Sequence, residues 1–341
     1  ADPDLCFSTL GHALKSLEYT MYGFVPEGSW VESNDYWGVT VECMVKIMSA
    51  LENSFDTDFN FGNYQGFENT CRFYASMGSS NGMLAWADGT ADSSGVSHQV
   101  FSYFAKRYNQ KDIAQLRRYN IEGSYKKISY TTPGIMDVLY YTPDSSMDDM
   151  KNMPKMTATH GFESVAFHED YTDPDSFFFA AHAGLSTYYH DHNDGGSFGF
   201  DMMGVRWATD IGKNNYNSGV ANNVLYRKRT EGHNTLTINN GTEYNQKAQS
   251  FAPLTDSKVN NAGGYAVYDL TPYYSKDSNS VKRGFYIDEN FNSLTVRDEL
   301  DLNKNSEVYW FMHTKAQIEI LDEKTALLSQ KGKSIMLQLE T

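Results

Sequence analysis

The hydrophobic pattern of this chain changes once, near residue 150, and that change constrains the fold more than any other feature. Over the first 120 residues, apolar side chains recur at spacings of three and four, which is typical of one face of a helix. From residue 157 onward, short apolar or alternating runs are separated by Asn, Asp, Gly and Lys, which is typical of antiparallel strands. We therefore expect an α+β chain with a helical domain over residues 1–145 and a β domain over residues 146–341.

The helical part is predicted to contain at least five helices joined by short loops. The first begins at Asp2, an N-cap acceptor followed by proline, and the second begins near Asn34. Three more are expected over about 63–77, 97–108 and 110–119. Their apolar faces consist of Phe7, Leu10, Leu14, Leu17 and Met21 in the first helix, and Trp37, Val41, Met44, Met48 and Leu51 in the second. Helices paired in this way are typical of an α-solenoid or an (α/α) toroid.

The β part is predicted to form a large antiparallel sandwich. Residues 176–183 are almost continuously apolar, as in a buried strand, and residues 235–238 alternate before a hairpin turn at Asn240-Gly241. Further strands are expected at 265–270, 284–288, 293–298 and 308–313. Residues 121–156 are interpreted as the link between the domains, with one helical turn near 135–140.

Composition excludes several classes of protein. The net charge of −15 argues against nucleic acid as a partner, and the sequence contains no run of about 18 apolar residues that would span a membrane. The aromatic content of 14% fits sugar-binding surfaces and also fits a β-rich core. Three cysteines, Cys6, Cys43 and Cys71, are interpreted as buried apolar residues and not as a disulfide framework.

Residues 190–198 (HDHNDGGSF) are the densest group of ionisable side chains in the chain. His190 and His192 would face the same side of a strand, because side chains there alternate with period two. Asp210 follows His192 by 18 residues, and His233 follows Asp210 by 23. Two or three imidazoles and a carboxylate are ligands that suit zinc.

Three segments of the chain resemble the heparinase II/III-like polysaccharide lyases, which include alginate lyases. The first segment is 27–37 (EGSWVESNDYW), the second is 190–198 continuing to 208–212 (ATDIG), and the third is 232–238 (GHNTLTI). The resemblance extends from about residue 20 to about residue 315. It implies an (α/α) toroid followed by antiparallel sheets, which agrees with the pattern of the sequence.

The resemblance also implies roles for individual residues. Tyr36 and His190 are the implied catalytic residues, and Tyr226 resembles a tyrosine that contacts substrate. The implied zinc ligands are His192, Asp210 and His233. Zinc is expected to be structural and to fix the strand that presents His190, although a Lewis-acid role stays open.

Other polar residues near the histidines have two interpretations each. Asp194 is either a fourth ligand or a support for the Gly195-Gly196 turn. Arg206, Arg227 and Arg229 either bind anionic groups of a sugar or belong to a solvated strand face.

One residue that the family uses is missing from the expected place. The family has an asparagine, often in an Asn-His pair, that binds the uronate carboxylate some fifty residues before the catalytic tyrosine. Only 35 residues precede Tyr36, and they contain no Asn-His pair. Because the toroid also looks short, we expect this chain to be a fragment; loss of that half from the full chain is the alternative.

The chemistry of uronate lyases suits these residue types. Such enzymes remove the C5 proton of a uronate, expel the 4-O-linked sugar and neutralise the neighbouring carboxylate. Tyr36 is interpreted as the acid, or as the base beside a positive charge. His190 is interpreted as the base, or as a donor to the carboxylate. Each is also compatible with a purely structural role.

We therefore expect a polysaccharide lyase that cleaves acidic, uronate-containing glycans, such as heparan sulfate or alginate, by β-elimination. The alternatives are a non-catalytic carbohydrate-binding or structural protein on a lyase scaffold, and a zinc-dependent hydrolase. The resemblance and the size of a polymeric substrate imply an extracytoplasmic location in the bacterial periplasm, at the cell surface or outside the cell. A monomer or homodimer is expected.

Overall fold

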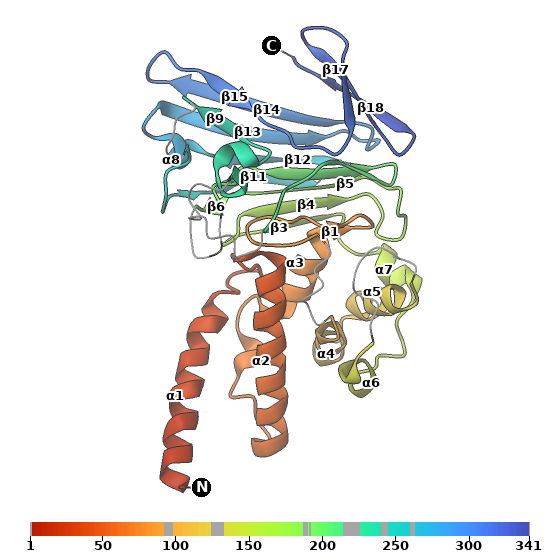
Figure 1. The fold of residues 1–341 in the computed structure, drawn as a ribbon. Helices are drawn as coiled ribbons and strands as arrows, with labels where there is room; N and C mark the ends of the chain where they lie inside the picture. The colour runs from red at the N-terminus through yellow and green to blue at the C-terminus, as the bar shows by residue number, and fades with distance from the viewer. Residues whose placement is uncertain are drawn as a thin grey trace.

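A computed structural model describes residues 2–91, 98–123, 133–186, 190, 192–213, 226–239, 245–259 and 263–340. The helices of its first half lie together at one end of the molecule and its larger sheets at the other (Figure 1). The helices of the first half are α1 (Pro3–Tyr22), α2 (Ser33–Phe55), α3 (Thr70–Ser76), α4 (Val100–Arg107), α5 (Lys111–Ile121), α6 (Ile135–Leu139) and α7 (Met147–Lys151). The chain is therefore helical and then β, as the hydrophobic pattern predicts.

The ends of the helices follow local sequence signals. The Asp2 carboxylate accepts hydrogen bonds from the backbone N–H groups of Asp4 and Leu5 and so caps α1. Helix α6 occupies the segment where one helical turn is expected, and α7 packs against α5.

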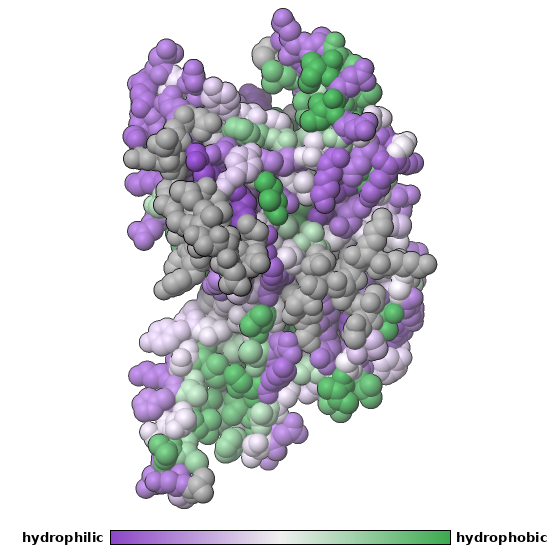
Figure 2. All heavy atoms as spheres, in the orientation of Figure 1, coloured by the Kyte–Doolittle hydropathy of each residue, from purple (hydrophilic) through white to green (hydrophobic). Residues whose placement is uncertain are grey.

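The apolar face of α1 is only partly covered. Met21 is its one buried residue in the described chain, while Leu5 and Phe7 are 65% and 69% exposed. Figure 2 shows hydrophobic residues gathered over the α1 and α2 end of the molecule. No helix in the described part of the chain is both long enough and apolar enough to cross a bilayer.

The cysteine interpretation holds for one residue of three. Cys71 in α3 is buried, but Cys6 and Cys43 are exposed, and all three are free thiols. Cys6 is exposed because it lies on the outer surface of α1. Cys43 lies between the buried positions Val41 and Met44 of α2, but its own side chain faces outward.

Two larger antiparallel sheets organise the β part. One has the order β3-β4-β5-β7-β8 and the other the order β11-β12-β13-β14. Their strands are β3 (Met156–Thr159), β4 (Ser164–His168), β5 (Phe178–His182), β7 (Phe198–Met202), β8 (Val205–Ala208), β11 (Leu254–Val259), β12 (Gly264–Asp269), β13 (Ser278–Ile287) and β14 (Leu294–Leu302). Most of the expected strands are present, some with shifted ends.

Smaller sheets complete the β part. Strand β9 (Leu236–Ile238) pairs with β15 (Val308–Trp310), so its observed partner lies some seventy residues away in the sequence. The hairpin turn expected at Asn240-Gly241 lies outside the described residues. The remaining strands are β1 (Gly78–Ser79), β2 (Gly82–Met83), β6 (Gly184–Leu185), β10 (Phe251–Ala252), β16 (Gln317–Ile320), β17 (Thr325–Gln330) and β18 (Lys333–Gln338), and a short helix α8 (Thr271–Tyr274) precedes β13.

The five-stranded sheet is buried on both faces. In β5, Phe178 and Ala180 belong to the hydrophobic core of the helices, whereas Phe179 and Ala181 belong to the core shared with the four-stranded sheet. This division follows from the alternation of side chains along a strand. It also explains why the sequence of β5 is continuously apolar.

His168, at the end of β4, gives the fold a pH-dependent stability. Burial lowers the pKa of His168 to about 4, against the opposing hydrogen bond between its Nε2 atom and the Ser76 carbonyl. In the unfolded chain the histidine has its ordinary pKa of about 6.5. Between that pH and the folded pKa, the unfolded chain therefore binds a proton that the folded chain does not bind. We expect this difference to reduce the free energy of unfolding by about 3 kcal/mol between pH 6.5 and pH 4.

Urea denaturation of the native chain and of His168→Gln tests this expectation. The variant should lose less stability than the native chain over that pH interval, because glutamine does not titrate. Parallel stability curves for the two proteins would contradict it.

Candidate functional site

Tyr36 and His190 lie face to face where the helices meet the sheets. Tyr36 is in the first turn of α2, and its ring stacks on that of His190 with centroids 3.8 Å apart and planes at 21°. Both side chains are half-buried. The structure therefore brings together two residues that are 154 positions apart in the sequence and that the sequence analysis selects as a catalytic pair.

His190 and His192 do not belong to a strand, in contrast to the expectation that they share one strand face. They lie in a turn and an irregular segment before β7. Their rings nevertheless reach the same group, the carboxylate of Asp88. Its Oδ2 atom is 3.2 Å from His190 Nδ1, and its Oδ1 atom is 3.1 Å from His192 Nε2.

Asp88 is a site residue that the sequence analysis missed. It is 1% exposed, and two cations also contact it: Arg227 Nη1 at 2.8 Å and Lys228 Nζ at 3.3 Å. Its loop lies between two predicted helices and carries no periodic signal, so only the long-range contacts reveal its place.

The surrounding charges keep Asp88 ionised. Burial alone would raise the pKa of Asp88, but hydrogen bonds from His192 and Arg227 and the charge of Lys228 hold it far below its ordinary value. Burial, the largest influence, lowers the pKa of His192, and this favours a neutral ring near pH 7. The positive charge that balances Asp88 then comes mainly from Arg227 and Lys228.

A second group of buried residues lies around His192 and His233, whose ring centroids are 5.2 Å apart. One nitrogen of each ring is anchored by a carboxylate: His192 Nε2 by Asp88, and His233 Nδ1 by Asp210 at 2.7 Å. Among the described residues, the other nitrogens, His192 Nδ1 and His233 Nε2, are buried without a hydrogen-bond partner. This pattern is typical of metal-ligating histidines, which bind the metal through one ring nitrogen and donate a hydrogen bond from the other to a carboxylate.

Asp194 lies beside the two imidazoles of His192 and His233. Ligand atoms of His192, Asp194 and His233 all lie within 4.8 Å of one another, and all three residues are buried. The Asp194 carboxylate also accepts a hydrogen bond from the Ala87 N–H at 3.1 Å. The donor set of imidazole nitrogens and carboxylate oxygens fits a divalent cation such as zinc.

The two alternatives for Asp194 do not exclude each other. Its backbone carbonyl accepts from the Ser197 N–H at 2.9 Å, which closes the turn through Gly195 and Gly196. Gly196 has φ +78°, a conformation that favours glycine. The backbone of Asp194 thus supports the turn while its side chain faces the histidines.

The arginines predicted to bind substrate have partners within the protein. The Arg206 guanidinium bonds to Asp201 at 2.7 Å and to the carbonyls of Met83 and Gly82 at 2.7 and 2.8 Å, which ties β8 to the hairpin β1–β2. Arg227 is 6% exposed and pairs with Asp88. These contacts favour a positioning role for both side chains.

Tyr226 is the most accessible of the predicted substrate contacts, with 51% exposure. It begins the 3₁₀ turn η5 (Tyr226–Lys228), and its hydroxyl donates to the Glu231 carbonyl at 2.8 Å. Burial raises the pKa of Tyr226, and the charge of Glu231 adds to this effect. The hydroxyl therefore stays protonated near neutral pH, and it also lies 3.0 Å from His313 Nε2.

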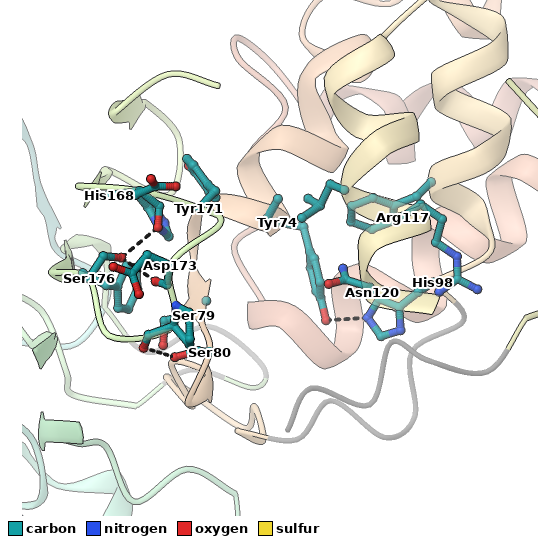
Figure 3. Close-up of a pocket in the computed structure, with 17 residues that line it drawn as sticks. Tyr74, Ser79, Ser80, His98, Arg117, Asn120, His168, Tyr171, Asp173 and Ser176 are labelled. Atoms are coloured by element: carbon teal, nitrogen blue, oxygen red, sulfur yellow. Dashed lines mark hydrogen bonds between the residues drawn. The ribbon is translucent and has the colours of Figure 1, made fainter. Parts of the chain in front are cut away.

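A separate pocket lies between the helices and the loop that precedes β5 (Figure 3). Tyr74 and His98 line its helical side, where the Tyr74 hydroxyl lies 3.0 Å from His98 Nε2, and Tyr171 lines the opposite side. None of the predicted site residues, all of which are described, lines this pocket. The candidate site is therefore the Tyr36–His190 region and not this cavity.

Comparisons of sequence and of structure both relate the chain to heparinases. A sequence model of the heparinase II/III-like C-terminal domain matches residues 161–341. A solved heparinase III gene product matches with a TM-score of 0.70 and 16% identity, over 95% of this chain and 47% of its own. A mutant of the heparan sulfate lyase HepC from Pedobacter heparinus matches with a TM-score of 0.70 and 14% identity, over 94% and 47% of the two chains. No curated protein sequence matches.

The chain thus spans about half the length of these solved structures. At 14–16% identity the likeness establishes the fold.

Proposed function

Because the chain belongs to the heparinase II/III-like family, we propose that it carries the catalytic pair of a polysaccharide lyase. The proposed reaction is β-elimination on a uronic-acid-containing acidic polysaccharide or oligosaccharide. The observation that carries the proposal is the stacking of Tyr36 on His190 at the junction of helices and sheets, with ring centroids 3.8 Å apart. In the same proposal the helices belong to an (α/α) toroid and the sheets to a β-sandwich.

The contacts of His190 favour the role of base. Ionised Asp88 lies 3.2 Å from Nδ1 and is placed to accept the N–H there, so Nε2 is the ring nitrogen proposed to take the proton. In β-elimination the base removes the C5 proton, the C4–O bond breaks, and the electron pair forms a C4–C5 double bond. Tyr36 then gives its hydroxyl proton to the departing O4 atom.

The metal is proposed to be zinc held by His192, His233 and Asp194, whose ligand atoms lie together. Asp210, the carboxylate ligand that the resemblance implies, bonds to Nδ1 of His233 and is proposed instead to hold that ring in place. The unpartnered ring nitrogens of His192 and His233 support this assignment. We propose a structural role for the ion, because all three ligand residues are buried. The ion would supply a fixed link between the segment after His190 and the segment before β9.

We expect both carboxylates to contribute to metal retention. Asp210→Asn and Asp194→Asn should each lower the metal content of the purified chain, measured by plasma mass spectrometry after dialysis against trace zinc. Asp201→Asn, which changes a buried carboxylate bonded to Arg206, is the control and should keep the native content. A native content in either test variant would show that this carboxylate is not needed to hold the metal.

Tyr226 is proposed to contact the sugar, since it is half-exposed and directly precedes Arg227 in η5. Arg227, another predicted substrate contact, is proposed to position Asp88. Arg206, the third, is proposed to hold β8 against the β1–β2 hairpin through Asp201 and two carbonyls. The proposed location is extracytoplasmic, because a polymeric glycan substrate is met there.

The test of the function is turnover of defined glycans. Heparan sulfate, heparin and alginate are each incubated with the chain, and the ultraviolet absorbance of an unsaturated uronate is followed. A rise with one of them is expected. Binding of a glycan without any rise would instead favour a carbohydrate-binding protein on a lyase scaffold. The match to only about half the length of the solved heparinases motivates this alternative.

A further inference from the structure

The carboxylate of Asp88 connects the catalytic pair with the metal cluster. Its Oδ2 atom faces His190 Nδ1 at 3.2 Å and Lys228 Nζ at 3.3 Å. Its Oδ1 atom faces His192 Nε2 at 3.1 Å and Arg227 Nη1 at 2.8 Å. One buried group is therefore shared by a candidate catalytic imidazole and a candidate metal ligand.

The backbone around Asp88 is fixed from both sides. The Asp88 N–H donates to the His190 carbonyl at 3.1 Å, and the Gly89 carbonyl accepts from the Lys213 N–H at 3.0 Å. Ala87 has φ +51°, a left-handed conformation that a non-glycine residue adopts only when its surroundings enforce it. The Asp88 side chain consequently has little freedom to move away from the two rings.

The same loop holds the start of α2. The Thr90 hydroxyl donates to both carboxylate oxygens of Asp35, at 3.1 and 2.9 Å, and Asn34 Nδ2 donates to the Thr90 carbonyl at 2.8 Å. A Cβ atom on Gly89 would lie 2.2 Å from the side-chain oxygens of Ser33 and Asn34, so only glycine permits this approach. Residues 88–90 thus touch His190 at one end and the turn that carries Tyr36 at the other.

We propose that Asp88 is a positioning residue of this site. It accepts the Nδ1–H of His190 and so fixes the neutral tautomer whose Nε2 atom takes the proton. Through His192 it also ties the orientation of that ring to the metal cluster. The catalytic consequence rests on the proposed lyase function, whereas the tautomer is a property of the chain itself.

The kinetic test is Asp88→Asn in the native chain. Asparagine keeps the shape of the side chain but removes the charge and offers a donor as well as an acceptor. We expect kcat to fall on the order of 10²-fold, the upper end of what loss of an orienting carboxylate costs, while KM changes little. Asp201→Asn, an equally buried carboxylate paired with Arg206, should leave kcat near the native value.

The spectroscopic test needs no turnover. Nitrogen-15 spectra of histidine-labelled chain report the tautomer of each ring, and the signals of His190 are assigned by their loss in His190→Gln. The native chain should show the Nδ1–H tautomer for His190, and Asp88→Asn should shift it toward the other form.

These two measurements separate the inference from the function. An Nε2–H tautomer in the native chain, or a His190 spectrum unchanged in Asp88→Asn, would overturn the positioning role. The expected tautomer shift in a chain that degrades no uronate glycan would uphold the positioning role and count against the lyase function. If Asp88→Asn does not fold, the native spectrum alone decides.

Discussion

His190→Ala is expected to lower kcat on glycan by on the order of 10²–10⁴-fold, the usual worth of a positioned proton-transfer group. The ring removed is the one that stacks on Tyr36 and bonds to Asp88. Tyr36→Phe should cause a loss of the same order, because it keeps the stacked ring and removes only the hydroxyl proton. The measurement is the initial rate of unsaturated uronate formation.

Matched controls for this pair come from α1, which contains none of the site residues. His12→Ala and Tyr19→Phe change an exposed histidine and an exposed tyrosine and should keep the native rate. Full activity in both test variants would show that Tyr36 and His190 are packing residues. A loss in only one would leave that residue as the proton-transfer group and assign the other to packing.

The second large effect is expected from the metal cluster. His233→Ala removes a proposed ligand and leaves the Asp210 carboxylate buried without the ring that it holds at 2.7 Å. Breaking a buried pair in this way costs about 3–5 kcal/mol of stability. We expect the variant to lose its metal and to unfold at a lower urea concentration.

The buried histidine His168 provides the comparison, because it lies on β4 and bonds to the Ser76 carbonyl and not to the cluster. His168→Gln should keep its metal content. Removal of the metal from the native chain with a chelator should lower its stability by most of the amount that His233→Ala loses. Any stability change caused by His168→Gln should be independent of the chelator. A native chain that retains no metal, with stability unaffected by chelator, would contradict the assignment.

Much of the fold was predictable because it follows from local patterns. Spacings of three and four mark α1 and α2, and the continuous apolar run marks β5, which both cores bury. The resemblance likewise selected Tyr36 and His190, which the structure brings into contact. The long-range partner of β9 was not predictable, since nothing in residues 236–238 encodes pairing with residues 308–310.

The parts of the site that escaped the sequence depend on contacts between distant segments. Asp88 is 102 residues from His190 and sits in a loop without periodicity, so its four partners appear only in three dimensions. Arg206 looked like a free cation in the sequence, yet its guanidinium is bonded to Asp201 and two carbonyls. The residue type alone does not distinguish a buried ion pair from a substrate contact.

Proton NMR of the products from a defined uronate oligosaccharide tests the central claim most directly. β-Elimination by Tyr36 and His190 predicts an olefinic H4 signal on the new non-reducing end, which disappears in His190→Ala. A cleaved product with a saturated end would instead identify a hydrolase, and an unchanged oligosaccharide would show that the pair does not perform this reaction.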